Sequence, residues 1–245
     1  MSLQDLLAIP DKVTSSYKED TEITPELILK DLDRYCSLIA YWRIYPDKFI
    51  DYMCSLDPNC HFKFYFYQRM ALRCFVRYKN VYATFVRAWS KSFMSVMALM
   101  CKAILYPGAK LFSVAGGKQQ SAEILKEKVN EICNLIPPLA NEIIWDTRGT
   151  RAETHQTKDS VKYTFKNGST VENIAATENT RGRRFHSGLM EECVGIDQEI
   201  LNEVIIPTLN VNRPLASGGN DPKEILNKSQ IFINFCWRKF IKIDA

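Results

Sequence analysis

The fold is decided by a stretch near the middle of the chain, residues 81–105, which reads VYATFVRAWSKSFMSVMALMCKAIL. Its first six residues, Val81–Val86, favour a strand, and Phe93–Leu105 is apolar enough for a buried helix. Six polar and aromatic residues, Arg87–Ser92, lie between them. A strand, a short turn and a helix in this order place the first amides of the helix where they can bind an anion.

The segments that follow predict a further strand and a further helix. Lys110–Val114 predicts a second buried strand, and Lys118–Ile136 predicts an amphipathic helix that Pro137-Pro138 ends. Strand, helix, strand, helix is typical of parallel strands with helices packed on the faces of the sheet. We therefore expect an α/β fold with a mostly parallel sheet flanked by helices.

The second half of the chain predicts a hairpin and three further elements. Val161–Phe165 and Thr170–Ile174 alternate in polarity, and Lys166–Ser169 between them contains the Asn-Gly pair that hairpin turns favour. An apolar strand leading into two acids, a helix and a last strand are expected at Gly188–Met190, Ile196–Leu209 and Gln230–Phe235.

Two helices are predicted before the first strand. One begins at Thr24–Leu27, which has a capping hydroxyl, a proline and an acid, and a further segment runs from Tyr45 to Met53. The second helix begins near Gln68 and has Leu72, Phe75 and Val76 on its buried side. We take residues 1–60 as an N-terminal arm and helical lead-in and residues 61–245 as the main domain.

Composition narrows the class of protein. Of the 245 residues, 46% are hydrophobic, which argues against wholesale disorder, and no apolar run is long enough to span a membrane. The first residues lack the pattern of a secretion signal, and the eight cysteines include no Cys-x-x-Cys pair. Reduced thiols in a cytosolic compartment fit this usage. The net charge of +4 permits an anionic partner.

Lys91 and Ser92 are the first candidates for chemistry. In a phosphate-binding loop the lysine balances charge on the outer phosphates, and the hydroxyl that follows holds a magnesium ion. The usual pattern has glycine before the lysine, whereas this chain has Ser90. A Lys-Ser pair after a strand also arises by chance.

Glu191 and Glu192 are the second candidates. An acid at the end of a hydrophobic strand supports the magnesium ion in nucleotide-hydrolysing enzymes, and the acid beside it activates the attacking water. Glu191 would take the metal-side role, where aspartate is usual, and Glu192 the water-activating role. The alternative is an exposed acidic pair at the start of a helix.

Two further residues have possible roles at such a site. The amide of Gln68 could pair with adenine while the ring of Tyr67 stacks on the base. Arg87 could reach the transferring phosphoryl group, as an arginine finger does. A surface glutamine and an ordinary surface arginine are the alternatives.

In their order along the chain, these residues resemble the large terminase subunit of tailed phages and related viruses. The hairpin turn, then Arg-Gly, then the acidic pair is the most specific part, and the resemblance spans roughly Phe62 to Trp237. The residues that carry it are Tyr67-Gln68, Arg87-Ala88-Trp89-Ser90-Lys91-Ser92, Phe165-Lys166-Asn167-Gly168-Ser169, Thr180-Arg181-Gly182 and Glu191-Glu192.

The resemblance implies a RecA-like P-loop sheet with a β-hairpin insertion, which makes residues 61–245 a P-loop ATPase domain. It implies ATP hydrolysis with Mg²⁺ that drives double-stranded DNA into a procapsid in the host cytoplasm. Glu192, Arg87 and Lys91 would be catalytic, and Ser92 and Glu191 would hold the metal. The nucleotide would be bound by Gln68, Trp89, Ser90, Lys91 and Ser92. Asn234 falls near the motif that couples hydrolysis to movement, where the family usually has a hydroxyl residue.

The resemblance also implies partners and an architecture. Such motors act as rings on a portal protein together with a small terminase subunit. Basic residues that could face DNA are Arg183, Arg184, Lys158 and Lys162. Family members carry a nuclease domain after the motor, and Ala245 falls about where it should begin, so we expect no nuclease activity from these residues.

Three other functions remain open from the sequence. A helicase would share the loop and the acids but should carry a second motor domain. A degenerate P-loop module would bind nucleotide or DNA without turnover, which the missing glycine and Glu191 favour. A capsid-associated structural module has no positive feature in its support.

Overall fold

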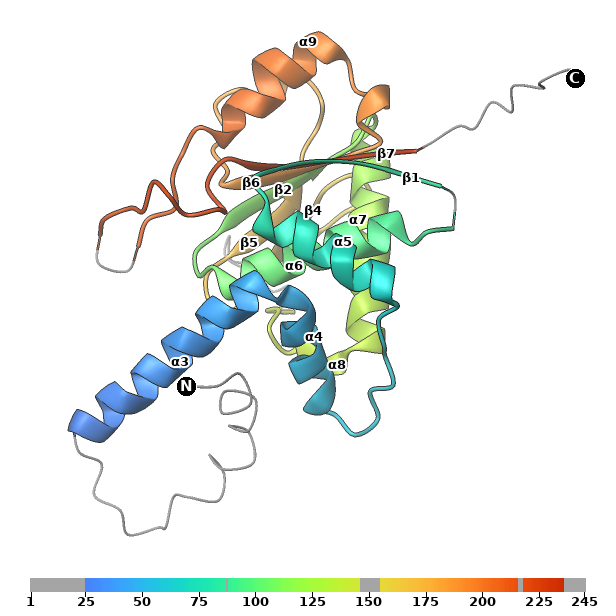
Figure 1. Ribbon diagram of the computed structural model, residues 1–245. Helices are drawn as coiled ribbons and strands as arrows, with labels where there is room; N and C mark the ends of the chain where they lie inside the picture. The colour runs from blue at the N-terminus through green and yellow to red at the C-terminus, as the bar shows by residue number, and fades with distance from the viewer. Residues whose placement is uncertain (1–24, 87, 146–154, 216–217, 236–245) are drawn as a thin grey trace, which may run out of the picture. The chain divides into compact units, whose positions relative to one another are not determined.

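Figure 1 shows the computed structural model of the chain, which describes residues 25–86, 88–145, 155–215 and 218–235. The chain divides into two compact units, Met1–Ile44 and Tyr45–Ala245. The described residues of the first unit form one helix, α3 (Pro25–Ile44), which begins at the proline of the predicted start signal. The second unit begins before the boundary at residues 60 and 61 that the sequence suggested.

The reason for the earlier start is the helix pair α4 (Pro46–Ser55) and α5 (Phe66–Arg77). Asp47 in α4 is fully buried and accepts hydrogen bonds from Arg73 Nε at 2.7 Å and Arg69 Nη1 at 3.2 Å in α5. These bonds join α4 to a helix of the α/β unit.

A seven-stranded sheet forms the centre of the second unit, in the order β1-β7-β6-β2-β5-β4-β3. The first five strands of this order are mutually parallel, and the β4-β5 hairpin makes the sheet antiparallel at one side. This confirms the expected α/β fold with a mostly parallel sheet and a hairpin. The strands are β1 (Asn80–Phe85), β2 (Lys110–Val114), β3 (His155–Gln156), β4 (Val161–Thr164), β5 (Thr170–Asn173), β6 (Ser187–Glu191) and β7 (Ser229–Phe235).

Helices cover both faces of the sheet (Figure 1). Helices α5 and α6 lie on one face, and α9 lies on the other. The structure confirms the predicted helix after β1 and the predicted helix after β2. The first of these begins at Lys91, two residues before the expected Phe93. The helices that follow β1 and β2 are α6 (Lys91–Leu105), α7 (Lys118–Leu135) and α8 (Pro137–Ala140).

The helix expected over Ile196–Leu209 is helical but irregular. It consists of one α turn, α9 (Gln198–Ile200), a π-helix, η3 (Leu201–Ile205), and a 3-10 helix, η4 (Ile206–Leu209). Pro207 lacks the backbone N–H that a continuous α-helix needs at this place, so the hydrogen-bond pattern changes. Two shorter 3-10 turns, η1 (Glu178–Thr180) and η2 (Cys193–Gly195), stand on either side of β6.

The Asn-Gly-Ser turn of the hairpin closes the far end of α6. Asn167 Nδ2 donates to the carbonyl oxygens of Ala103 and Ile104, each at 2.9 Å, and Ser169 Oγ donates to Tyr106 O at 3.0 Å. The last carbonyl oxygens of a helix accept no hydrogen bond within the helix. Here the side chains of the turn provide the donors for them. The motif therefore has a structural role that the sequence did not reveal.

Parallel strands end at one edge of a sheet, and this edge holds the candidate residues. The loop after β1 leads into α6, β6 ends at Glu191, and β7 lies between these two strands. None of the helices in the described part of the chain is long and apolar enough to cross a membrane.

Candidate functional site

The loop between β1 and α6 turns without glycine. Ala88 and Ser90 have positive φ angles of 62° and 63°. Ser90 is the N-cap of α6, and its carbonyl accepts the helix bond from Met94 N at 3.0 Å. The left-handed conformation disfavours residues with a Cβ atom. Ser90 therefore adopts the backbone geometry that glycine takes freely at this place in a phosphate loop. Arg87 lies outside the described residues.

The two candidate pairs from distant parts of the sequence meet. Lys91 Nζ donates to Glu191 Oε1 at 3.4 Å and to Glu192 Oε1 at 3.1 Å. Ser92 Oγ donates to Glu191 Oε1, and Ser95 Oγ donates to Glu191 Oε2 at 3.4 Å. The start of α6 and the end of β6 thus form one polar cluster.

The two acids of this cluster have different environments. Glu191 is the last residue of β6 and is 1% exposed, whereas the side chain of Glu192 is 46% exposed. Burial raises the pKa of Glu191, and the hydrogen bond from Ser92 and the charge of Lys91 oppose that rise. Glu192 has a left-handed backbone, with φ 51°, which turns it away from the strand. One carboxylate is therefore buried among donors, and the other faces solvent beside the lysine.

The donor set suits magnesium. Ser92 and Glu191 place a hydroxyl and a carboxylate oxygen in direct contact. Mg²⁺ prefers hard oxygen ligands and is usually held by one or two carboxylates together with substrate phosphates. A single buried carboxylate with a neighbouring hydroxyl fits this kind of site.

Aromatic rings from the loop, from β1 and from α5 contact one another. Trp89 stacks on Phe85, with ring centroids 4.1 Å apart, and its ring lies 5.0 Å from that of Tyr67. Gln68 is buried, and its Oε1 accepts from Tyr65 N at 3.0 Å at the start of α5. The structure therefore brings Tyr67 to the loop, while the amide oxygen of Gln68 accepts a backbone hydrogen bond at the start of α5.

Two polar side chains complete the cluster. Gln120, in the first turn of α7, donates from Nε2 to Glu192 Oε2 at 3.1 Å. Asn234 on β7 accepts from Val194 N at 3.2 Å and donates to the Tyr82 hydroxyl, so it joins the loop after Glu192 to β1. Sequence reasoning had named Asn234 but missed Gln120. A polar residue in the first turn after a parallel strand was the available signal.

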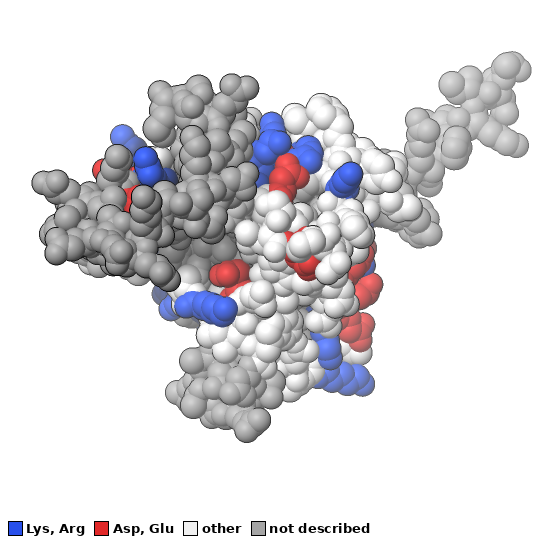
Figure 2. Space-filling view, turned by 90° about the horizontal axis from the view of Figure 1, so that it is seen from below, with Lys and Arg blue, Asp and Glu red and all other residues white. Residues whose placement is uncertain are grey.

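The basic residues proposed to face DNA are partly paired. Arg183 Nη1 donates to Glu172 Oε2 at 3.0 Å, and Arg184 Nη1 donates to the carbonyl of Arg183. On the described part of the face in Figure 2, Lys and Arg side chains are interspersed with Asp and Glu rather than gathered in one patch.

Comparisons with known proteins give a likeness in fold. No family model and no curated protein matches the sequence. The large terminase of bacteriophage HK97 is similar over 71% of this chain and 33% of its own, with 12% identity and a TM-score of 0.50. The large terminase ATPase domain of Thermus phage P74-26 is similar over 71% and 66%, with 17% identity and a TM-score of 0.46.

A third similar structure is the large terminase of another thermophilic bacteriophage in complex with ADP, with 10% identity and a TM-score of 0.47. It is covered over 39% of its length by 71% of this chain. The chain thus spans between a third and two thirds of these three proteins. Over 71% of its length the chain therefore shares its fold with a third of the bacteriophage HK97 large terminase.

Proposed function

We propose that this chain is a magnesium-dependent ATPase and that it serves as the motor domain of a terminase large subunit. The observation that carries the proposal is the contact of Lys91 and Ser92 with Glu191 and Glu192. A lysine and a hydroxyl at a helix start, facing a buried acid and an exposed acid, are the groups that phosphoryl transfer to water requires.

Each residue of the cluster has a role that follows from its position. Lys91 and the first amides of α6 bind the outer phosphates, and Ser92 and Glu191 hold the magnesium ion. The ion, when bound, neutralises charge that develops on the phosphates. Glu192 is exposed enough to accept a hydrogen bond from a water molecule and to orient it. The rings of Tyr67 and Trp89 offer a face on which a base could stack. Arg87 retains its expected role as part of the proposal. Gln68 would pair with adenine through its Nε2 and the second lone pair of Oε1, because the first accepts from Tyr65 N.

Phosphate release from ATP, with and without Mg²⁺, tests the proposal. Lys91→Ala should abolish both nucleotide binding and turnover. Glu192→Gln should keep nucleotide binding and lower turnover by about 10²–10⁴-fold, the usual contribution of a general base. Glu123→Gln on the exposed face of α7 is the matched control and should leave the rate unchanged. Turnover that survives Glu192→Gln would remove that residue from its role.

A second candidate function is nucleotide binding without turnover. The non-glycine residues Ala88 and Ser90 in left-handed conformations favour it, since they set the loop in a strained geometry. ATP binding that depends on Lys91, combined with no phosphate release from the unaltered protein, would decide for this candidate.

The biological setting of the motor is proposed on the fold and on the sequence motifs. Double-stranded DNA, a portal protein, a small terminase subunit and a ring of copies are the expected partners, in the host cytoplasm. Residues 61–245 would be the ATPase domain and residues 1–60 its arm and helical lead-in, of which α4 is joined to the domain through the contacts of Asp47 with α5. Stimulation of ATP turnover by duplex DNA, in the presence of a procapsid with its portal, is the measurement that addresses this setting.

A further inference from the structure

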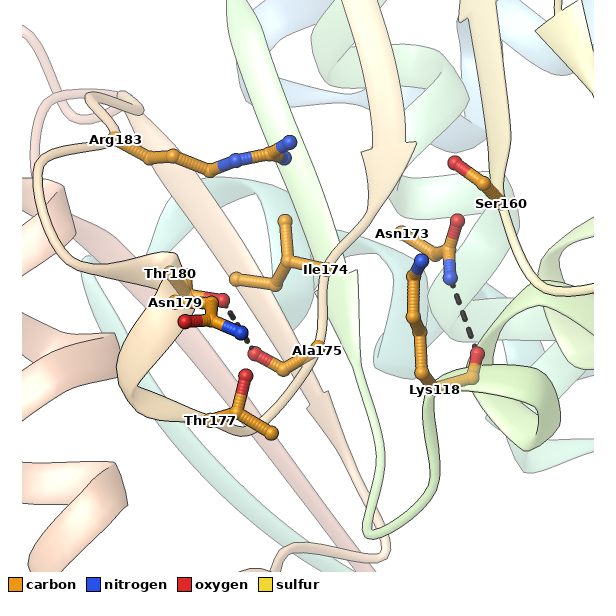
Figure 3. A pocket seen from close by; sticks show the side chains of 9 residues that line it. All are labelled: Lys118, Ser160, Asn173, Ile174, Ala175, Thr177, Asn179, Thr180 and Arg183. Carbon is orange, nitrogen blue, oxygen red and sulfur yellow. Dashed lines mark hydrogen bonds between the residues drawn. The ribbon is translucent and has the colours of Figure 1, made fainter.

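A polar cavity lies at the same edge of the sheet as the Lys91 cluster and is lined by other residues. It has a volume of about 410 Å³ and opens where β5 ends and α7 begins (Figure 3). In open α/β sheets, ligands bind outside the carboxyl ends of the strands, which is where this cavity lies. Its lining residues come from the start of α7, the β3-β4 connection, the end of β5, the β5-η1 connection, η1 and the segment after η1. They are Lys118, Ser160, Asn173, Ile174, Ala175, Thr177, Asn179, Thr180 and Arg183.

The charge of the lining is positive. Lys118 and Arg183 are its ionic members, and among the described residues that line the cavity there is no carboxylate. Figure 3 shows Lys118 rising from the start of α7 and Arg183 reaching in from the loop on the other side. The cavity is also lined by Ser160, on the side of Lys118, and by Thr177 and Asn179, which lie with Thr180 on the side of Arg183. Two cations with neutral donors make a setting for an anion that also accepts hydrogen bonds.

Both cations have acidic partners outside the lining. Lys118 Nζ lies 3.3 Å from Asp159 Oδ2, and Arg183 Nη1 lies 3.0 Å from Glu172 Oε2. The side chains of Lys118 and Arg183 are 43% and 47% exposed, and ion pairs this exposed contribute little. A phosphoryl group with three acceptor oxygens could therefore replace Asp159 and Glu172 as the partner of the two cations, and the lost ion pairs would cost little free energy.

The start of α7 adds a positive electrostatic potential, which favours an anion in the cavity. This helix is 18 residues long, and its N-cap, Gly117, has no side-chain cap. The first amides of such a helix carry partial positive charge at the mouth of the cavity. The Asn173 amide holds this end in place by donating to Lys118 O at 3.1 Å and to Asp159 O at 3.1 Å.

Two contacts connect this end of α7 to Glu192. Gln120 follows Lys118 by two residues and donates to Glu192 Oε2. A Cβ atom at Gly116 would lie 2.8 Å from Gly195 O, so the loop before α7 packs directly against the loop after Glu192. Movement of the first turn of α7 would therefore reach the exposed acid of the Lys91 cluster.

We propose that this cavity binds a phosphoryl group and that its occupancy is transmitted to Glu192 through Gln120. The binding of a phosphoryl group is inferred from the cavity itself, whereas the transmission to Glu192 rests on the proposed ATPase function. The phosphoryl group could come from a nucleic-acid backbone or from free phosphate, and the chemistry of recognition is the same for both.

Binding is tested on the Lys91→Ala variant, because the candidate nucleotide site is then disabled. Inorganic phosphate, followed by calorimetry, should bind this variant, and adding Lys118→Ala or Arg183→Ala should weaken binding at least fivefold. Lys126→Ala, an exposed lysine further along α7, is the matched control and should not change it. Arg183→Lys should retain part of the affinity. Equal affinity in all these variants would overturn the assignment.

A short DNA duplex distinguishes the two sources of the phosphoryl group. If the duplex binds and inorganic phosphate displaces it in competition, the ligand is a nucleic-acid backbone. If phosphate binds and the duplex does not compete, the ligand is free phosphate. In each case the affinity must depend on Lys118 and Arg183 for the assignment to stand.

Transmission is tested by hydrolysis in the otherwise unaltered chain. A saturating concentration of the cavity ligand should change the ATP turnover rate at least twofold, and Gln120→Ala should remove this change while leaving ligand affinity intact. Gln119→Ala, which bonds Glu123 and not Glu192, is the control. A ligand effect that persists in Gln120→Ala would overturn the transmission alone. A chain that binds phosphate but hydrolyses no ATP would overturn the transmission together with the proposed function, and the cavity assignment would stand.

Discussion

At the scale of single residues, the loop before α6 holds a serine where the proposed phosphate loop would usually have glycine. Ser90 takes a left-handed backbone, and the neighbouring helix depends on this because the Ser90 carbonyl accepts the first helix bond. The left-handed region costs a residue with a Cβ atom about 1–2 kcal/mol. The loop is therefore held in shape by the strand and helix on either side of it.

Ser90→Gly should raise the free energy of unfolding by about 0.5–1 kcal/mol. Relief of the left-handed strain exceeds the extra entropy that glycine gives the unfolded chain. Urea unfolding measures the change. Lys126→Gly, at an exposed position in the middle of α7, is the control and should lower the free energy of unfolding, since glycine disfavours a helix interior. A fall in stability for Ser90→Gly would contradict the strain argument.

At the scale of elements, α6 is attached to the sheet at both ends. Its start contacts Glu191 through Lys91 and Ser92, and near its other end Lys102 donates to Ser187 Oγ and Ser229 Oγ, each at 3.1 Å. These two serines begin β6 and β7, and Lys102 is fully buried. The Lys102 side chain thus joins α6 to β6, which ends at Glu191, and to β7, which carries Asn234.

Lys102→Met should stabilise the protein at neutral pH. Burial lowers the pKa of Lys102 from its usual value of 10.5 to about 7, because the ammonium loses hydration. Between about pH 7 and pH 10 the unfolded chain holds more protons, so this group makes stability rise with pH across that window. The variant lacks this dependence and should exceed the parent by on the order of 3 kcal/mol at pH 7.

Urea unfolding at about pH 6, 8 and 10 measures this difference, which should shrink as pH rises. Ser229 Oγ still donates to Ser187 Oγ at 2.6 Å, so the serines keep a partner in the variant. Lys126→Met is the exposed control and should show no such trend. A difference that stays constant with pH would mean that Lys102 does not titrate in this range.

The α4-α5 pair is held by a buried ion pair. Asp47 is 0% exposed; burial opposes its ionisation, but the hydrogen bonds and charges of Arg73 and Arg69 outweigh this and hold its pKa below the usual range. Asp47→Asn should lower the free energy of unfolding by about 3 kcal/mol, since it leaves two arginines without their buried carboxylate. Asp51→Asn, which affects a side chain that is 35% exposed, should lower it by no more than about 1 kcal/mol. Chemical unfolding of both variants checks the contrast, and equal losses would contradict it.

At the scale of the whole α/β unit, the core between the sheet and the α9-η4 segment depends on Gly188, because a glycine has no side chain at this position. Phe112 on β2 packs in this core with residues of β6, η3 and η4. It is paired in register with Gly188 on β6, and a Cβ atom at Gly188 would lie 2.3 Å from Phe112 Cζ. The glycine therefore makes room for the ring.

Gly188→Ala should lower the free energy of unfolding by about 2 kcal/mol, because the ring must leave its position in a close-packed core. Phe112→Leu in the same chain should recover part of the loss, since the shorter side chain clears the new methyl group. A double-mutant cycle on thermal or urea unfolding measures the coupling. Additive losses would show that the two residues do not share the space.

The sequence by itself determined the type and order of the main elements. Val81–Val86 and Lys110–Val114 were identified because their strand pattern is local, and the amphipathic helix after Lys118 was identified from its own period. The alternation of these elements implied parallel strands, and the fold followed. The irregular helix over Ile196–Leu209 was described less well, because a π turn has no simple sequence period.

Only the tertiary structure decided which side chains meet. Lys91 and Glu191 are 100 residues apart in the chain, and their contact depends on β7 lying between β1 and β6. The bond of Gln120 to Glu192 and the closure of α6 by Asn167 depend in the same way on strand order and register. Local patterns carry no information about such pairings, since the free energy that fixes them comes from burying whole elements against one another.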